Sequence, residues 1–261
     1  MDKLEIRNLT KSFGHSEVLH DISFTVRDGE FLSILGPSGC GKTTILRILI
    51  GLEDAESGTI LKDGVDITKV PSAKRRMGIV FQNYALFENM TVLKNVQYAL
   101  VKSASTKDTF DKEKALEKAK EMLELVGLSE HLDKKPRQLS GGQQQRVAIA
   151  RTLALNPDVI LFDEPMSALD VDTRLSLRSE LKELQKRFGT TMIYITHDQE
   201  EAFAMSDRIM VMEAGDIHQI DTPQNIVDHP ADDYVKKFVI NNINTKINSL
   251  IQFARTEGQD S

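Results

Sequence analysis

The chain has 261 residues, of which 40% are apolar and 28% charged, a balance that is ordinary for one large globular α/β domain or a domain with a sub-lobe. The net charge of −6 argues against nucleic-acid binding as the main function. No apolar run reaches the roughly 18 residues of a membrane span, and no signal segment opens the chain. One cysteine allows no internal disulfide, which fits a reducing cytoplasm.

Residues 3–26 alternate apolar and polar side chains, a pattern that predicts antiparallel strands. Phe13 falls between the two runs, where its ring could stack on an adenine base or simply pack as an ordinary aromatic side chain.

A glycine-rich segment follows, placed between an expected buried strand (31–35) and an expected helix (45–50). Its pattern Gly-x-x-x-x-Gly-Lys-Thr in this context predicts a phosphate-binding loop, in which backbone N–H groups and a helix N-terminus face the phosphates. Lys42 can reach the β- and γ-phosphates and the Thr43 hydroxyl can hold Mg²⁺. The alternative is a glycine-rich turn that binds nothing. The predicted nucleotide-binding residues here are Gly36, Pro37, Ser38, Gly39, Cys40, Gly41, Lys42, Thr43 and Thr44, with Cys40 as a small spacer, not a nucleophile.

The middle of the chain is predicted to hold a hairpin (57–67), a short strand ending in Gln82 and a mainly helical stretch. A weak helical pattern covers 92–103, a polar loop 103–112, and Asp111 can cap the next helix. In that helix the apolar face is expected to be core; it comprises Leu116, Ala119, Met122, Leu123 and Val126. We expect a helical subdomain over about 88–155, inserted in a main domain of residues 1–235, with a C-terminal helical extension over 236–261.

Ser140-Gly141-Gly142 opens another expected helix, with Ser140 at the N-cap. The two glycines leave the first-turn N–H groups open to an anion. Without a partner this is only a glycine-softened helix start; beside a phosphate loop it indicates a second phosphate-binding segment.

An apolar run at 159–162 predicts a central parallel strand, and it ends in Asp163 and Glu164. A carboxylate at this point is placed to hold Mg²⁺ through water, and the next can orient or deprotonate an attacking water. The alternative is a plain exit from a buried strand.

The last third is predicted to hold a helix (171–188), a strand (192–195), a hairpin around 214–215, a short helix starting at Thr222, and a helix over 232–255. His197 follows the strand, at the edge where α/β proteins bind ligands, although a structural histidine is the alternative.

Together, Gly36–Thr44, Gln82, Leu139–Arg146, Val159–Pro165, Ser167–Asp170 and His197 resemble the nucleotide-binding subunits of ABC transporters, over residues 3 to about 235. The resemblance implies a P-loop α/β fold with a mixed sheet core, an N-terminal antiparallel β subdomain and an inserted helical subdomain. It implies ATP and Mg²⁺ as cofactors and a head-to-tail homodimer that holds each ATP between two chains.

Carried onto this chain, the resemblance makes Phe13 the adenine-stacking residue and Asp163, Thr43 and Gln82 the metal-contacting residues. Ser140, Gly142 and Gln143 would contact the γ-phosphate of the other chain's nucleotide, and Asp170 would lie on the dimer seam. The expected catalytic residues are Glu164, His197, Lys42 and Gln82.

Segments 81–87 and 196–202 resemble bacterial importers of sugars, polyamines, iron, quaternary amines or organophosphonates. Glu88-Asn89 and Met166 depart from that branch. Many importers of the branch continue with a β-rich regulatory domain, which we expect to be missing here. The implied partners are integral membrane permease subunits and a periplasmic or lipoprotein solute-binding protein, with the chain peripheral on the cytoplasmic side of the membrane. General appearance favours an organophosphonate or an osmolyte as the solute. An exporter ATPase and a soluble non-transport ABC ATPase remain as alternatives.

Overall fold

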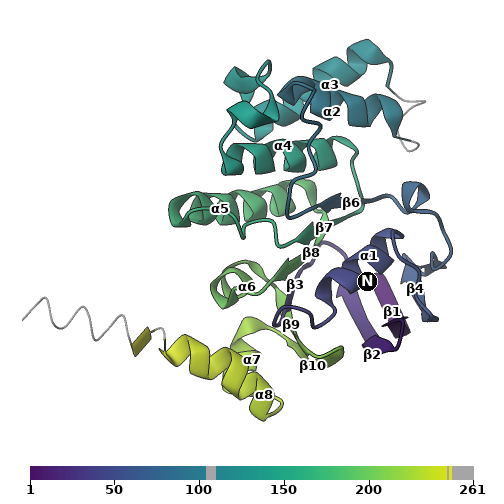
Figure 1. Cartoon of the computed structure of the whole chain (residues 1–261), viewed down its shortest axis with the longest axis vertical. Helices are drawn as coiled ribbons and strands as arrows, with labels where there is room; N and C mark the ends of the chain where they lie inside the picture. Colours follow the sequence, from purple (N-terminus) through teal and green to yellow (C-terminus); the bar gives the residue numbers. More distant parts are fainter. Residues whose placement is uncertain (104–109, 246, 249–261) are drawn as a thin grey trace, which may run out of the picture.

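The computed structural model describes residues 1–103, 110–245 and 247–248, and it contains two β-sheets with helices packed around them (Figure 1). The larger sheet has six strands in the order β10-β9-β3-β8-β7-β6. Its strands are, in chain order, β3 (Phe31–Leu35), β6 (Met77–Val80), β7 (Val159–Asp163), β8 (Thr191–Thr196), β9 (Arg208–Glu213) and β10 (Asp216–Asp221).

Strands β3, β6, β7, β8 and β9 run parallel, and only β10 pairs antiparallel with its neighbour. Every residue of β3 and β8 is buried, as parallel strands covered on both faces require. Figure 1 shows α5 and α6 on one side of this sheet and α1 with the second sheet on the other. The expected central strands are confirmed, although the strand predicted to end in Gln82 ends at Val80, where the chain enters a turn with positive φ at Tyr84 and Ala85.

The second sheet is the predicted antiparallel one, with four strands in the order β2-β1-β4-β5. Its strands are β1 (Asp2–Phe13), β2 (Ser16–Arg27), β4 (Ser57–Lys62) and β5 (Val65–Asp66). In β1, Leu4 and Ile6 are fully buried while Glu5 between them is not, so the alternation in the sequence corresponds to an inner and an outer face.

The long helices begin and end at residues that suit their caps. The helices around the six-stranded sheet are α1 (Lys42–Ile50), α5 (Val171–Phe188) and α6 (Gln199–Met205). Gly51 and Gly189 end α1 and α5 with φ of 80° and 60°, a conformation that favours glycine, and Asp170 caps the start of α5.

Between β6 and β7 the chain forms a helical layer, which Figure 1 shows above the sheet. Its helices are α2 (Val92–Lys102), α3 (Lys112–Leu125) and α4 (Gly141–Ala154), with short 3₁₀ turns at Ser129–His131 and Pro136–Gln138. Another 3₁₀ turn, Ser72–Lys74, precedes β6 and lies outside this layer in the sequence. Asp111 caps α3 as expected, and Ala119, Met122 and Leu123 are buried, whereas Leu116 is only partly so. Most of the predicted loop 103–112 lies outside the described residues.

The C-terminal part begins with α7 (Pro223–Asp228), capped by Thr222 as predicted. Then α8 (Asp233–Val235) continues directly into the π-helical turn η4 (Lys236–Asn241). The helix predicted over 232–255 is therefore present as far as the chain is described, and its remainder lies outside the described residues. The proposed domain boundaries stay a prediction. In the part of the chain that the structure describes, no helix is both long and apolar enough to cross a membrane.

The side chain of Arg75 fastens the end of α1 to the segment before β6. Its guanidinium is 3% exposed and donates to the carbonyl oxygens of Ile48 and Leu49 at 2.7 and 2.8 Å. The same group donates to the carbonyls of Val70 at 2.7 Å and Thr68 at 3.0 Å. One cation thus satisfies carbonyls at the end of a helix and in a neighbouring loop.

We therefore expect Arg75→Ala to lower the free energy of unfolding by about 2–4 kcal/mol, because two buried and two partly buried carbonyls lose their donor. Chemical denaturation followed by circular dichroism measures this. The neighbouring Arg76 is the control, since its exposed side chain pairs with Asp158 at 3.2 Å and Arg76→Ala should cost less than about 1 kcal/mol. Equal losses for the two variants would contradict the role given to Arg75.

Candidate functional site

The site is built at the edge where the carboxyl ends of three adjacent parallel strands meet. In register, Leu35 at the end of β3 lies opposite Thr196 of β8, and Ile195 of β8 lies opposite Asp163 of β7. The glycine-rich loop follows β3, His197 follows β8, and the two acidic residues end β7. The topology therefore brings together three segments that are far apart in the sequence.

The loop of residues 36–41 is shaped by close backbone approaches that only glycine permits. A Cβ atom at Gly36 would lie 2.5 Å from the carbonyl oxygen of Met212, and one at Gly41 would lie 3.0 Å from the carbonyl oxygen of Val18. Gly39 and Gly41 also have φ of 84° and 100°. The close approaches and the positive φ values explain why glycine occupies these positions. Both features are expected of a phosphate-binding loop.

Lys42, the first residue of α1, is 4% exposed and its ammonium donates to the carbonyls of Gly36 and Pro37, both at 2.7 Å. The cation is therefore held over the loop, where a phosphate oxygen could replace these carbonyls. Burial raises the pKa of the Cys40 thiol, an effect that Lys42 opposes, so the raised pKa favours the neutral thiol.

A cavity of about 180 Å³ opens over this loop. Ser38, Thr43 and Thr44 of the loop line it together with Val18 and Glu164. Val18 belongs to β2 in the other sheet. Sequence reasoning missed it, because nothing in an alternating strand marks which side chain will border a loop from elsewhere in the chain.

Thr43 and Asp163, both predicted metal-contacting residues, are in direct contact. The Thr43 hydroxyl donates to Oδ1 of Asp163 at 2.9 Å. Burial raises the pKa of Asp163, and the Thr43 hydrogen bond opposes that rise; a positive ion in contact would oppose it further. A hydroxyl and a carboxylate oxygen, with phosphates and waters to complete the shell, fit Mg²⁺, which rarely takes an all-protein cage. Among the described residues no cluster of three or more acidic, histidine or cysteine side chains offers such a cage.

Glu164 and His197, two predicted catalytic residues, also meet. Nδ1 of His197 lies 3.1 Å from Oε2 of Glu164. Glu164 has a φ of 44°, an uncommon value for a non-glycine residue, and its N–H donates to the carbonyl of Ile195 at 3.2 Å. The turn after β7 thus directs this carboxylate toward His197 and the cavity, while Asp163 faces Thr43.

Arg174 of α5 holds the segments after β7 and β8 together, and sequence analysis did not single it out. It donates to the carbonyl of Leu169 at 3.1 Å and to Oδ2 of Asp198 at 3.2 Å. Behind it, buried Glu201 accepts hydrogen bonds from Tyr194 and Thr196, both at 2.8 Å. The position of His197 therefore depends on this polar network. In the sequence, Arg174 looks only like one polar residue of an amphipathic helix.

Gln82 lies beside this group without reaching the metal-contacting pair. Its Nε2 donates to the Ser167 hydroxyl at 3.1 Å, and that hydroxyl donates to the carbonyl of Glu164 at 3.1 Å. In the described part of the chain no hydrogen bond joins Gln82 to Thr43 or Asp163. Its contact with the metal stays a prediction, and the structure connects it to the Glu164 turn instead.

The Ser140 segment forms the expected helix cap. The Ser140 hydroxyl accepts from the N–H of Gln143 at 3.3 Å, and the Gln143 side chain accepts from the N–H of Ser140 at 3.1 Å. A Cβ atom at Gly142 would lie 2.5 Å from Cγ2 of Thr173, whose hydroxyl donates to Asp170 at 2.7 Å. The caps of α4 and α5 are thus neighbours.

No hydrogen bond among the described residues joins Ser140, Gly142 or Gln143 to the phosphate loop. Figure 1 places α4 in the upper helical layer and α1 beside the antiparallel sheet. The structure therefore keeps the two predicted phosphate-binding segments of one chain apart. The Phe13 side chain, also predicted to bind nucleotide, is 49% exposed, and the Lys11 ammonium lies 4.9 Å from the centre of its ring.

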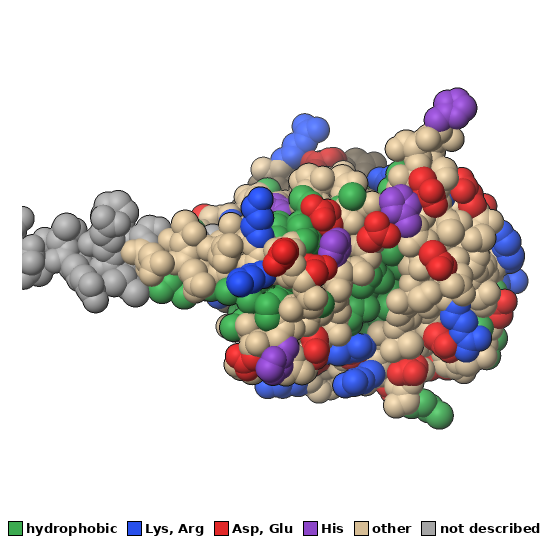
Figure 2. All heavy atoms as spheres, turned by 90° about the horizontal axis from the view of Figure 1, so that it is seen from below, with side chains coloured by type: hydrophobic (Ala, Val, Ile, Leu, Met, Phe, Trp, Pro, Cys, Tyr) green, Lys and Arg blue, Asp and Glu red, His purple; other side chains and the backbone are tan. Residues whose placement is uncertain are grey.

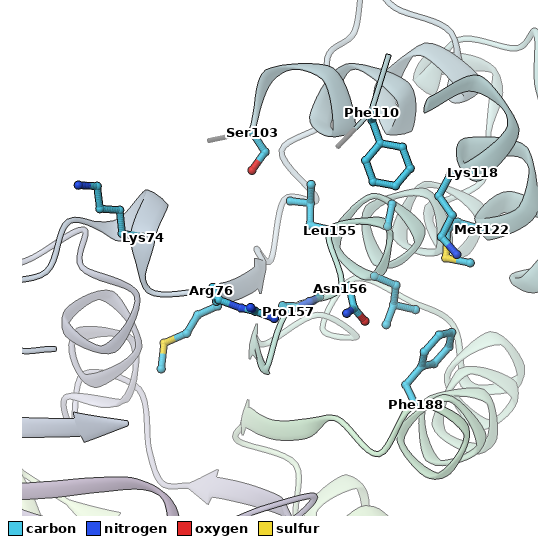
Figure 3. A pocket seen from close by; sticks show the side chains of 13 residues that line it. Lys74, Arg76, Ser103, Phe110, Lys118, Met122, Leu155, Asn156, Pro157 and Phe188 are labelled. Carbon is cyan, nitrogen blue, oxygen red and sulfur yellow. The ribbon is translucent and has the colours of Figure 1, made fainter. Parts of the chain in front are cut away.

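A larger cavity, of about 660 Å³, lies elsewhere (Figure 3). Arg76 and Pro157, which border it, precede β6 and β7, so it lies at the opposite end of these strands from the phosphate loop. Phe110, Leu155 and Phe188 gather on one side of it, and Lys74 points away (Figure 3). None of the predicted site residues lines it.

The chain is similar in sequence to a known family and to several known proteins. A family model described as "ABC transporter" matches residues 19–167. The chain is 49% identical over 236 residues, 90% of its length, to the spermidine/putrescine import ATP-binding protein PotA of Aggregatibacter actinomycetemcomitans. It is 49% identical over 233 residues, 89% of its length, to the Fe(3+) ions import ATP-binding protein FbpC of Rhizobium etli. It spans 62% and 65% of the lengths of these two relatives.

A solved structure, described as the dimeric structure of a post-hydrolysis state of the ATP-binding cassette MJ0796 bound to ADP and Pi, superimposes with a TM-score of 0.75. The identity is 34%, and the match covers 84% of this chain and 98% of that one. This likeness confirms the predicted fold class. With the family model covering more than half of the residues, the chain belongs to the ABC transporter family.

Proposed function

We propose that this chain is the ATP-binding and ATP-hydrolysing subunit of a bacterial importer. The observation that carries the proposal is the convergence of Lys42, the Thr43–Asp163 pair and the Glu164–His197 pair at one strand edge. Its relatives named above are import ATP-binding proteins, which favours an importer over an exporter or a soluble ATPase.

Each group has a distinct task in this proposal. The loop N–H groups and Lys42 bind and neutralise the phosphates, while Thr43 and Asp163 hold Mg²⁺, which supplies charge neutralisation when bound. Glu164 orients or deprotonates the attacking water, and His197 contacts the γ-phosphate. Because the site is made of positioned charges and dipoles, it suits phosphoryl transfer to water, where positioning matters more than covalent chemistry.

Two copies of the chain form the complete site. In one copy the Ser140 cap has its anion-facing N–H groups but no phosphate loop beside it, so a head-to-tail pair supplies each nucleotide with the phosphate loop of one chain and the Ser140 cap of the other. Asp170, next to that cap, then lies on the seam. The dimeric state of the ADP-bound relative supports this arrangement.

An exposed aromatic pair near Gln82 suits a permease contact. Phe87 and Tyr98 are each 40% exposed, with ring centres 5.2 Å apart. Fully buried Asn95 fixes the loop that presents Phe87, accepting from its N–H at 2.8 Å and donating to its carbonyl at 3.2 Å. Rigid, exposed aromatic residues are favoured anchors at protein interfaces. In this proposal the chain sits on the cytoplasmic side of the membrane, bound to permease subunits.

The solute is outside the reach of this chain, because a permease and a periplasmic or lipoprotein binding protein would contact it. The relatives' names favour a polyamine or ferric iron among the solutes left open by the sequence. The expectation of an organophosphonate or an osmolyte has no support from them. Identifying the solute that the partner binding protein retains tests this choice.

We expect Glu164→Gln to keep ATP binding and to lower the rate of ATP hydrolysis by about 100-fold or more, since a neutral amide no longer activates water. Phosphate release and equilibrium ATP binding measure the two effects. Glu183→Gln, on the exposed face of α5, is the control and should hydrolyse ATP at the wild-type rate. Wild-type turnover by Glu164→Gln would remove Glu164 from the mechanism.

We expect Tyr98→Ala to weaken association with the permease by about 10-fold while the isolated chain keeps its basal ATPase rate, because an exposed aromatic anchor is lost. Quantitative pull-down with detergent-solubilised permease measures the association. Val65→Ala, which trims an exposed apolar residue of β5 in the other sheet, is the matched control. Unchanged binding by Tyr98→Ala would place the permease contact elsewhere.

A further inference from the structure

The segment Tyr234–Phe238 contacts two residues that adjoin the proposed ATPase site, Met212 and Gln199. The Tyr234 hydroxyl donates to the carbonyl oxygen of Met212 at 3.4 Å, a long hydrogen bond. The carbonyl of Phe238 accepts a short hydrogen bond from Nε2 of Gln199. Met212 supports the phosphate loop and Gln199 follows His197, so a single short segment lies behind both.

The first contact leads to the phosphate loop through the end of β9. A Cβ atom on Gly36 would lie 2.5 Å from the carbonyl oxygen of Met212. This carbonyl therefore limits how closely the start of the phosphate loop can approach β9. Three residues on, the N–H of Gly215 donates to the carbonyl of Cys40 at 3.2 Å, near the end of the loop. The turn between β9 and β10 therefore supports the phosphate loop at both ends.

The second contact leads to His197. Gln199 is the first residue of α6, directly after its cap Asp198 and two residues after His197, and it is 6% exposed. Its other polar side-chain atom, Oε1, is buried and finds no hydrogen-bond partner among the residues that the structure describes. The hydrogen bond to Phe238 is thus the polar contact that fixes this side chain at the start of the helix.

The segment is itself held rigidly. The Tyr234 ring stacks on Phe238 with centres 5.4 Å apart and an angle of 7°, and its centre lies 4.6 Å from that of His218. His218 is held by Asp232 at 2.7 Å and Glu213 at 3.5 Å. Figure 2, which views the molecule from the end that carries β10 and α8 in Figure 1, shows histidine and acidic side chains gathered beside exposed hydrophobic ones on this face.

Burial, together with the nearby Glu213, Cys40 and Asp232, raises the pKa of Tyr234 to about 12. The hydroxyl therefore stays protonated near neutral pH and remains a donor to Met212. Fully buried Val235, between the two contacts, anchors the same turn in the apolar cluster beside β9.

We propose that Tyr234 and Gln199 are positioning residues, and that the segment Tyr234–Phe238 clamps the phosphate loop through Met212 and the His197 helix through Gln199. The inference rests on the proposed ATPase function. It assigns the two contacts to different steps: Tyr234 supports nucleotide binding, and Gln199 supports turnover by keeping His197 in place.

The test compares Tyr234→Leu with Gln199→Leu. Tyr234→Leu should weaken Mg-ATP binding about 5-fold to 10-fold with kcat within about 2-fold of wild type, because only the floor of the binding loop is loosened. Gln199→Leu should give the reverse split, a kcat lowered about 5-fold to 10-fold with binding nearly unchanged. Lys237→Ala, an exposed position on the same turn, should change neither.

A second readout needs no nucleotide. Cys40 is the single cysteine of the chain and is 3% exposed in the phosphate loop, so its rate of reaction with N-ethylmaleimide reports how firmly the loop is held. Tyr234→Leu should react several times faster than wild type, and Gln199→Leu at the wild-type rate. Should Tyr234→Leu fail to fold, Tyr234→Phe keeps the ring contacts and should shift binding and labelling the same way, by about 2-fold.

The outcomes distinguish a failure of the proposed function from a failure of the clamp. A wild-type chain that binds no ATP overturns the proposed function. A wild-type chain that binds and hydrolyses ATP, with variants that leave both parameters unchanged or shift both together, overturns the clamp alone. The crossed pattern, with faster Cys40 labelling in the Tyr234 variants only, supports it.

Discussion

The parallel pairing of β3, β8 and β7 is the constraint on which the site depends. These strands are buried on both faces, so their register cannot shift without exposing apolar side chains. With the register fixed, the loop after β3, the histidine after β8 and the acidic residues after β7 must meet at one edge. The Thr43–Asp163 and Glu164–His197 contacts, across 120 and 33 residues of sequence, follow from that arrangement.

In the proposed function, the same topology leaves each chain with one half of the nucleotide site. The helix that carries Ser140 belongs to the layer inserted between β6 and β7, and it packs on α5 through Gly142 and Thr173, away from the phosphate loop. The reciprocal hydrogen bonds of Ser140 and Gln143 explain the helix cap locally. In the proposed function, the N–H groups at this helix start bind an anion that another molecule supplies. The proposed pairing of two copies accounts for both observations, with the nucleotide as the contact between the two chains.

Much of the fold and the site could be predicted from local patterns. Glycines at fixed spacing, a buried strand ending in acidic residues, and helix caps at Asp111, Ser140 and Thr222 are short-range signals, and each lies where it was expected. The residues that were missed, Val18, Arg174, Met212 and Tyr234, act on the site across strands or helices that are distant in sequence. Within a strand or an amphipathic helix such residues look like any other, because their partners are set by tertiary packing. The sequence predicts that β6 ends at Gln82, two residues later than it does. The turn that follows has positive φ at Tyr84 and Ala85, and no glycine in the sequence indicates it.

Activity in mixed chains tests the shared site most directly. One chain carries Lys42→Ala and the other Ser140→Arg, so each alone lacks one half of every site. In a head-to-tail pair of unlike chains, one of the two sites unites the intact phosphate loop with the intact Ser140 cap. Mixing equal amounts should therefore recover about a quarter of the wild-type ATPase rate, because half of the pairs are unlike and each has one complete site. A mixture no more active than its separate components, although the chains are shown to exchange, would contradict a nucleotide site shared between two copies.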